Sequence, residues 1–285
     1  GGAASTTRGL IAGGGSGPAE YSYIDSITIA SLGDAIDFGD LNYTSTTGVG
    51  GGSNATRAIW WGGSDTPGYS NVNTICFNTI ATTGNSIDFG DTSTNTSSGS
   101  AMPDGTRCVM KLGAGNGAST TTTNQIESIQ FATTGNATDF GDLTIARAHG
   151  AGISNQTRCT MVGGSASSGN QDRIDFVTTA TTGNAVDFGN LIEATEHLCA
   201  TSSPTRGIIA GGNPGVANRI QFITITTSGN AEDFGDLQSL GDVMMGGALS
   251  SPVRAIFAGN YTNKIESLQI VTKGNSTNFG TMTTS

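Results

Sequence analysis

Two histidines occupy matching positions in consecutive parts of the chain, and imidazole serves readily in metal binding and acid–base chemistry. His149 and His197 each stand nine residues after the Phe of an Asp-Phe-Gly tripeptide. A metal site needs three or four ligands, and Glu193 and Glu196 are the acidic residues close to His197. Because matched histidines are more often coincidental than ligating, the sequence predicts no tightly bound metal and no cofactor.

The aromatic residues indicate a different chemistry, the recognition of a sugar. Tyr and Trp gather near the start of the chain, at Tyr21, Tyr23, Tyr43, Trp60, Trp61 and Tyr69. A flat apolar ring beside Asn and Asp can stack on a neutral sugar while the polar groups bind its hydroxyls. We therefore expect a ligand-binding patch formed by Tyr21, Tyr23, Tyr43, Trp61 and Tyr69. The competing interpretation places Trp60 in the hydrophobic core and the tyrosines over loops.

Charge and hydropathy argue against two classes of partner. The 285 residues carry a net charge of −10, and six of the twelve basic residues are regularly spaced arginines. Little positive charge remains for a phosphate backbone, so nucleic acid is not an expected partner. No long apolar run and no signal peptide are visible, so no membrane insertion is expected. The four cysteines lack metal-finger spacing and are interpreted as space-filling thiols: Cys76, Cys108, Cys159 and Cys199.

These residues belong to a chain that repeats itself six times. The stretch from Thr133 to Asp142 reads TTGNATDFGD, and close variants end at Asp40, Asp91, Asn190, Asp236 and Thr281. An Arg that opens a short apolar run recurs in step, at Arg8, Arg57, Arg107, Arg158, Arg206 and Arg254. Successive arginines lie 48 to 51 residues apart. A period near fifty residues indicates a repeat architecture.

Each repeat divides into four strand-like segments, which in the fourth repeat cover 150–154, 158–164, 173–180 and 185–189. The TTGN before the last segment suits a tight hairpin, because Gly and Asn tolerate positive φ. Short strands without helical periodicity indicate an all-β, six-bladed β-propeller with four antiparallel strands per blade. The blades are expected in one domain, at approximately 1–41, 42–92, 93–143, 144–191, 192–237 and 238–285.

The repeat resembles the kelch type of propeller blade. Gly-Gly pairs close the second segment at 13–14, 62–63, 163–164 and 211–212, and the Phe of each tripeptide stands where a kelch blade has Trp. The resemblance implies a kelch-like propeller over the whole chain. The sequence TTGNAxDFGDL is also similar to repeats in tail-fibre and other virion proteins of marine bacteriophages. That similarity implies a virion or extracellular appendage that contacts a host surface.

The repeat also leads to expectations about packing. The six tripeptide Phe residues should be buried between blades. The Asp that precedes five of them should pair with a repeat Arg, because a buried charge needs a partner, while Asn278 in the sixth repeat cannot form a full ion pair. Each blade should use consecutive strands, with Gly1 and Ser285 close together at the junction of the first and sixth blades. Loops between second and third strands vary most in length, so binding is expected on their face of the ring.

The sequence favours a non-enzymatic recognition or structural module of the tail-fibre kind. Its expected partners are a host cell-surface glycan or receptor, or other virion proteins. One alternative is a glycan-active or metal-dependent enzyme at the channel mouth, near His149 and His197. Another is a purely architectural domain within an assembly.

Overall fold

The computed structural model describes residues 1–13, 15–16, 19–45, 48–65, 70–111, 113–114, 122–213, 218–238, 247–258 and 263–282. Regular structure in these ranges consists of strands β1 to β28. Among the same residues there is no apolar helix of membrane-spanning length.

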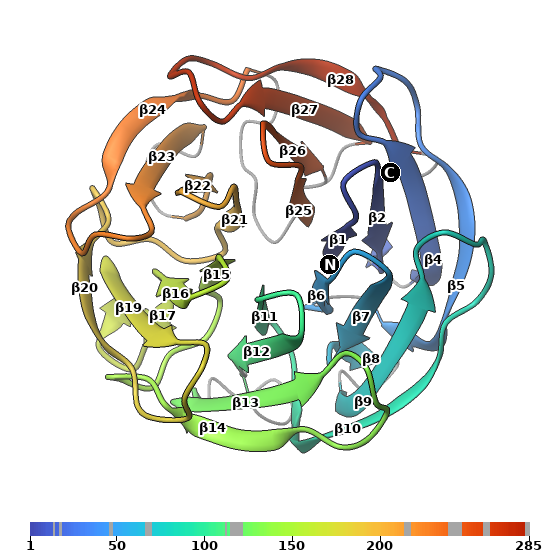
Figure 1. Cartoon of the computed structure of the whole chain (residues 1–285), viewed down its shortest axis with the longest axis horizontal. Helices are drawn as coiled ribbons and strands as arrows, with labels where there is room; N and C mark the ends of the chain where they lie inside the picture. The colour runs from blue at the N-terminus through green and yellow to red at the C-terminus, as the bar shows by residue number, and fades with distance from the viewer. Residues whose placement is uncertain are drawn as a thin grey trace.

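Six antiparallel four-stranded blades surround a central opening, which confirms the predicted all-β, six-bladed propeller (Figure 1). Blade 1 contains β1 (Gly2–Ala4), β2 (Arg8–Ala12), β4 (Ala19–Thr28) and β5 (Ile36–Ser45); blade 2 contains β6 (Gly50–Ser53), β7 (Arg57–Trp61), β9 (Ser70–Thr79) and β10 (Ile87–Thr96). Blade 3 contains β11 (Ser100–Pro103), β12 (Arg107–Lys111), β13 (Gln125–Gln130) and β14 (Thr138–Asp142); blade 4 contains β15 (Ala151–Ser154), β16 (Arg158–Val162), β19 (Arg173–Thr178) and β20 (Val186–Asn190). Blade 5 contains β21 (Cys199–Ser202), β22 (Arg206–Ala210), β23 (Arg219–Thr224) and β24 (Glu232–Asp236); blade 6 contains β25 (Gly247–Ser250), β26 (Arg254–Ala258), β27 (Lys264–Gln269) and β28 (Thr277–Thr281).

Within the described ranges, short extra strands occur in three loops between second and third blade strands. β3 (Gly15–Ser16) pairs with β4, β8 (Ser64–Asp65) pairs with β9, and β17 (Ser165–Ala166) pairs with β18 (Gly169–Asn170). Isolated bridges join such loops to the connections between blades, as between Ala148 and Ser165. These loops and the interblade connections therefore share one face of the ring, which we call the connection face.

The first strand of each blade lies beside the central opening, and neighbouring first strands touch around the ring (Figure 1). Where two first strands face each other, their convergence leaves no room for a side chain at some positions. A Cβ atom on Gly2 would lie 2.5 Å from the Ala248 carbonyl oxygen, and one on Gly51 would lie 2.8 Å from the Gly2 nitrogen. The glycine-rich inner segments are thus a steric requirement of the ring.

The core lies between blades, as predicted for the tripeptide Phe residues. Each is at most 3% exposed: Phe38, Phe89, Phe140, Phe188, Phe234 and Phe279. Phe140 packs with Met102 and Val109 of its own blade and with Cys159 and Met161 of the next. Burying such a side chain stabilises the interface by about 1.5–3 kcal/mol.

The recurrent TTGN turn of one blade contacts the Asp-Phe-Gly motif of the blade before it. We call this contact the perimeter clasp. In the clasp between blades 3 and 4, the Gly183 N–H donates to the Phe140 carbonyl at 2.8 Å. The Asn184 Oδ1 atom accepts from the Asp142 N–H at 3.0 Å. Gly141 has φ +148°, and a Cβ atom there would lie 2.4 Å from the Gly183 carbonyl oxygen. Both motifs recur in the repeats because the last strand of each blade must fit against the turn of the next blade.

The sixth blade is closed onto the first by the same clasp. Gly33 donates its N–H to the Phe279 carbonyl at 3.3 Å. Asp34, standing where the other turns have Asn, accepts from the Thr281 N–H at 3.1 Å and from its hydroxyl at 2.7 Å. Every blade is built from consecutive strands, as predicted, and none of the described strands is exchanged across this junction. The expected proximity of Gly1 to Ser285 concerns a residue outside the described ranges.

The predicted pairing of repeat Arg with tripeptide Asp is wrong. Arg158 donates to the Ile225 carbonyl of the next blade at 3.1 Å, and its guanidinium lies 4.5 Å from the centroid of the Phe176 ring. Asp187, the tripeptide Asp of the same blade, is exposed. Each of the other repeat arginines also donates to a backbone carbonyl of the following blade. The carbonyls at the end of a third strand satisfy the guanidinium, so an acid is not required.

Buried polar residues on the third strands hold the connections between blades. Glu127 accepts from the Ser93 N–H at 3.2 Å, and Glu266 accepts from the Gln238 N–H at 3.1 Å. Asp175 accepts from the Thr144 hydroxyl and forms an ion pair with Arg147 at 2.9 Å, with both side chains almost completely buried. These carboxylates are committed to the fold.

Candidate functional site

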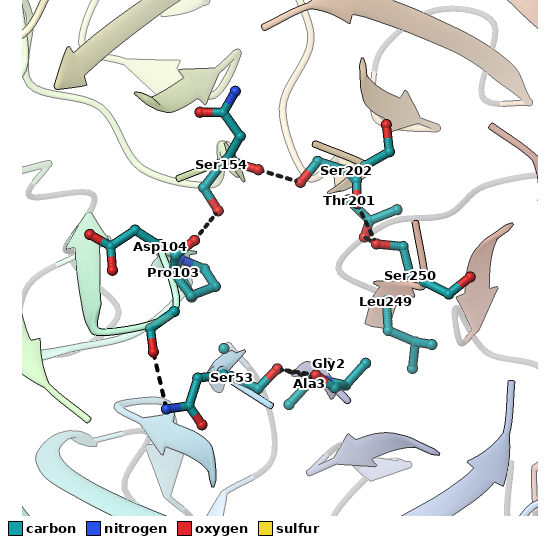
Figure 2. A pocket seen from close by; sticks show the side chains of 18 of the residues that line it. Gly2, Ala3, Ser53, Pro103, Asp104, Ser154, Thr201, Ser202, Leu249 and Ser250 are labelled. Atoms are coloured by element: carbon teal, nitrogen blue, oxygen red, sulfur yellow. Dashed lines mark hydrogen bonds between the residues drawn. The ribbon is translucent and has the colours of Figure 1, made fainter. Parts of the chain in front are cut away.

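A cavity of about 700 Å³ opens around the axis at the ends of the first strands (Figure 2). Its walls are the last residues of these strands and the short loops that follow, so it lies on the face opposite the connection face. Small-molecule sites typically have volumes of about 300–1,000 Å³. We call this cavity the axial pocket.

A chain of serine hydroxyls lines the axial pocket. Ser53, Ser154, Ser202 and Ser250 each end a first strand. Each donates its hydroxyl to the carbonyl of the equivalent residue in the preceding blade, at 2.6–2.7 Å. Ala4 and Pro103 hold this position in the other two blades, as Figure 2 shows for Pro103. The serine protons are therefore committed, while lone pairs of the hydroxyls and carbonyls stay available as acceptors.

Amide side chains and one carboxylate lie at the rim of the axial pocket. The Asn54 Nδ2 donates to the Gly105 carbonyl at 3.2 Å, and the Asn155 Nδ2 donates to the Pro204 carbonyl at 3.0 Å. Asp104 is the one carboxylate among the described lining residues, and its Oδ1 accepts from the Arg107 N–H at 2.7 Å. Gln156 is exposed. The pocket thus offers uncharged donors and acceptors rather than a nucleophile with an adjacent base.

The two matched histidines meet at the opposite end of the first strands. His149 comes just before β15 and His197 just before β21, and their ring centroids lie 4.2 Å apart. Glu196 joins them, because its Oε2 lies 3.4 Å from His149 Nδ1 and 3.6 Å from His197 Nε2. Only 28%, 18% and 17% of the side-chain surfaces of His149, Glu196 and His197 are exposed. Of the two acids near His197 in the sequence, the structure selects Glu196, while Glu193 pairs with Arg219.

Burial favours the neutral form of both imidazoles. Desolvation, and next the charge of His197, lower the pKa of His149 to about 4, against the opposing effect of Glu196. Desolvation also lowers the pKa of His197. Lys111 contributes to the low pKa of His149, and its own pKa falls to about 7 because its ammonium is buried. The Lys111 Nζ atom has no hydrogen-bond partner within the described part of the chain.

Of the five residues expected in the aromatic patch, the structure describes the side chains of three, and one of them lies in the core. Trp61 is completely buried and packs against Gly50 and Gly99, so it cannot present a ring at the surface. Tyr43 is partly buried against the core shared by blades 1 and 2, whereas Tyr23 is 47% exposed. Tyr69 and the side chain of Tyr21 lie outside the described residues. Trp60 is also buried, and its Nε1 donates to Asn78 Oδ1 at 2.8 Å.

The four cysteines are buried free thiols, as their interpretation as space-filling residues requires. Burial raises the pKa of Cys76 to about 11 and that of Cys108 to about 12. Since the thiolate is the reactive form, these groups are poor nucleophiles.

The sequence therefore located the histidines but not the axial pocket. The serines of the pocket stand at the same position in four repeats, a signal that could have been read as one face of a ring. Comparison with protein-family models and with curated proteins finds no match to this chain.

Proposed function

We propose that this propeller is a non-enzymatic recognition module whose axial pocket binds a neutral, hydroxyl-rich segment of a host-surface glycan. The observation that carries the proposal is the lining of that pocket with small uncharged polar groups, whose single described carboxylate already serves the backbone. The similarity of the repeats to kelch blades and to marine phage tail-fibre repeats supports an appendage on a virion. Other virion proteins are the second class of partner.

The electrostatics favour a neutral ligand. A net charge of −10 disfavours anionic polymers, while sugar hydroxyls can donate to the carbonyls and serine oxygens of the pocket. The blades are joined by clasps and buried cores, so the pocket is preformed and binding orders little of the protein. This rigidity suits adhesion more than a catalytic cycle that requires closure.

A glycan array probed with the whole chain would identify the ligand, and calorimetry with that ligand would measure the affinity. Ala55 lines the mouth of the pocket and is exposed, and A55W should narrow this mouth and weaken binding at least about tenfold. Q156A, at an exposed rim amide, should weaken binding less. The control is A132L on the perimeter, where Ala132 is exposed.

Unchanged affinity in A55W, with the fold intact by circular dichroism, would contradict binding in the axial pocket. A chain that binds no glycan on the array but co-purifies with a virion protein would instead favour the architectural alternative. Hydrolysis of array glycans by the wild-type chain would favour the enzyme alternative.

A further inference from the structure

We propose that His149, Glu196 and His197 bind one divalent transition-metal ion of the Zn²⁺ class at the connection-face end of the channel. This inference is independent of the glycan proposal, which concerns the opposite end of the first strands. It goes against the expectation from the sequence, which named Glu193 and Glu196 as acids near His197 but could not show that Glu196 meets both histidines between two interblade connections.

The spacing of the ligand atoms fits a metal. Zn–N and Zn–O bonds of about 2.0–2.1 Å in a tetrahedron place neighbouring ligand atoms about 3.4 Å apart. The Glu196 Oε2 atom lies 3.4 Å from His149 Nδ1 and 3.6 Å from His197 Nε2. All three ligand atoms lie within 4.8 Å of one another, so a small rotation of the imidazoles would complete the set. Two nitrogens and one oxygen are a donor set that suits zinc.

The backbone holds these side chains in place at a conformational cost. His149 and His197 both have φ +57°, a left-handed conformation that costs a non-glycine residue about 1 kcal/mol or more. The His197 N–H donates to the His149 carbonyl at 2.7 Å. Flanking residues are fixed too, because Ala148 exchanges two backbone hydrogen bonds with Ser165 and Glu196 exchanges two with Asn213. The backbone that carries the imidazoles is thus held in place before any ion arrives.

The imidazole nitrogens also lack the hydrogen bonds expected of buried polar groups. Nδ1 of His149 and Nδ1 of His197 are buried and have no hydrogen-bond partner among the described residues. The first lies near Glu196 without the alignment of a hydrogen bond. Buried polar atoms are usually paired, so an unpaired imidazole beside a carboxylate indicates a missing partner. An ion among the three residues would supply it for His149.

The ion would join two successive connections between blades. His149 belongs to the connection between blades 3 and 4, and Glu196 and His197 belong to that between blades 4 and 5. Three protein ligands leave at least one coordination position for water or for a donor from a bound partner. Partial exposure of all three side chains gives ions in solution access to the cluster.

The test is titration of the metal-free whole chain with Zn²⁺ by calorimetry and with Co²⁺ by visible absorption. We expect one ion per chain, a four-coordinate Co²⁺ spectrum and a higher melting temperature with Zn²⁺. H149N and H197N should each weaken Zn²⁺ binding at least about tenfold, because Asn keeps the left-handed backbone but binds zinc poorly. E196Q should weaken binding as well.

Matched controls separate loss of a ligand from a general disturbance. S98N changes the equivalent position in blade 3, where Ser98 has φ +56°, and should leave Zn²⁺ affinity unchanged. E193Q removes a nearby carboxylate that pairs with Arg219 and should also leave it unchanged. A Kd weaker than about 1 mM for wild type, or wild-type Zn²⁺ affinity in folded H149N and H197N, would overturn the proposal.

Discussion

At the scale of single residues, Lys111 is a lysine whose side chain is buried inside the ring. It stands at the end of β12, where other blades have Ala12, Trp61, Val162, Ala210 and Ala258, and it is 1% exposed. Its Nζ atom has no hydrogen-bond partner among the residues that the structure describes. Burial, followed by the nearby charge of Arg147, lowers its pKa to about 7. A buried unpaired ammonium opposes folding.

The pKa of Lys111 predicts how stability depends on pH. Between pH 7 and 10.5 the unfolded chain retains a proton that the folded chain has released, so the free energy of unfolding should rise with pH. Below about pH 7 Lys111 is protonated in the folded chain as well, so the full free-energy cost of burying its ammonium opposes folding. K111M should therefore be more stable than wild type at pH 7, by an amount on the order of a few kcal/mol. Its free energy of unfolding should also rise much less between pH 7 and pH 10.5 than that of wild type.

Urea unfolding at pH 7 and pH 9 would measure both effects. K264M, at an exposed lysine, is the control and should keep the wild-type dependence on pH. If K111M were less stable than wild type at pH 7, Lys111 would have to make a favourable interaction in the folded chain.

The residue scale also shows what the sequence could not give. The Phe of each Asp-Phe-Gly was predictable as a buried residue, because a large apolar side chain that recurs with the blade period has few other places to go. The partner of each repeat Arg was not predictable, because the backbone carbonyls that accept from it are present in every sequence and leave no signature. The meeting of Glu196 with both histidines depends on a left-handed backbone at non-glycine residues, which residue type does not reveal.

At the scale of elements, the perimeter clasp explains why two glycines in similar surroundings differ in importance. Gly141 follows Phe140 in β14 and has φ +148°, and an added Cβ atom would lie 2.4 Å from the Gly183 carbonyl oxygen. Gly183, in the facing turn, has open space where its Cβ atom would be. Both glycines recur in the repeats, but only Gly141 is required for steric reasons.

G141A should therefore destabilise the chain by about 2 kcal/mol or more, through the close contact and the backbone strain together. G183A should change the free energy of unfolding by less than about 1 kcal/mol. Urea unfolding monitored by tryptophan fluorescence would compare the two variants. Equal losses would mean that the clasp tolerates a shift of its turn and that the contact does not fix the spacing of the blades.

The element scale was largely predictable in outline. Strand order, the four-strand blade and the hairpin at TTGN follow from short apolar segments and turn residues. The turn has a second role, because the Asn184 Oδ1 atom accepts from the Asp142 N–H in β14 of the preceding blade. This contact was not predicted, because it links residues in different blades. Similarly, the sequence placed Trp61 on a surface, but its position in β7 directs the ring into the core between blades 2 and 3.

At the scale of the whole molecule, the ring is closed by a noncovalent junction whose clasp uses Asp34 instead of Asn. D34A removes the acceptor for the Thr281 N–H and hydroxyl. Losing these hydrogen bonds should cost about 1–2 kcal/mol locally, so amide exchange at this junction should accelerate about five- to thirtyfold. Hydrogen–deuterium exchange read by mass spectrometry would show faster exchange in β5 and β28.

The matched variant N184A disrupts the clasp between blades 3 and 4 and should accelerate exchange in β14 and β20 instead. Faster exchange in the same strands for both variants would indicate that the ring opens as one unit, contrary to a local junction.

Each type of hydrogen bond between blades also runs in the same direction around the ring. In five of the six blades the turn glycine donates its N–H to the blade before it, and in blade 5 the Ala231 N–H donates to Asn190 of blade 4. The channel serine, where present, also donates to the blade before, whereas the repeat Arg donates to the blade after. A blade therefore has two unlike edges, and a copy of it can join the array only head to tail. Tandem duplication of one repeat unit would create matching edges automatically, without a new interface having to evolve. Such a polarity lets an ancestral ring gain or lose a blade by recombination, provided that the remaining clasps can still close.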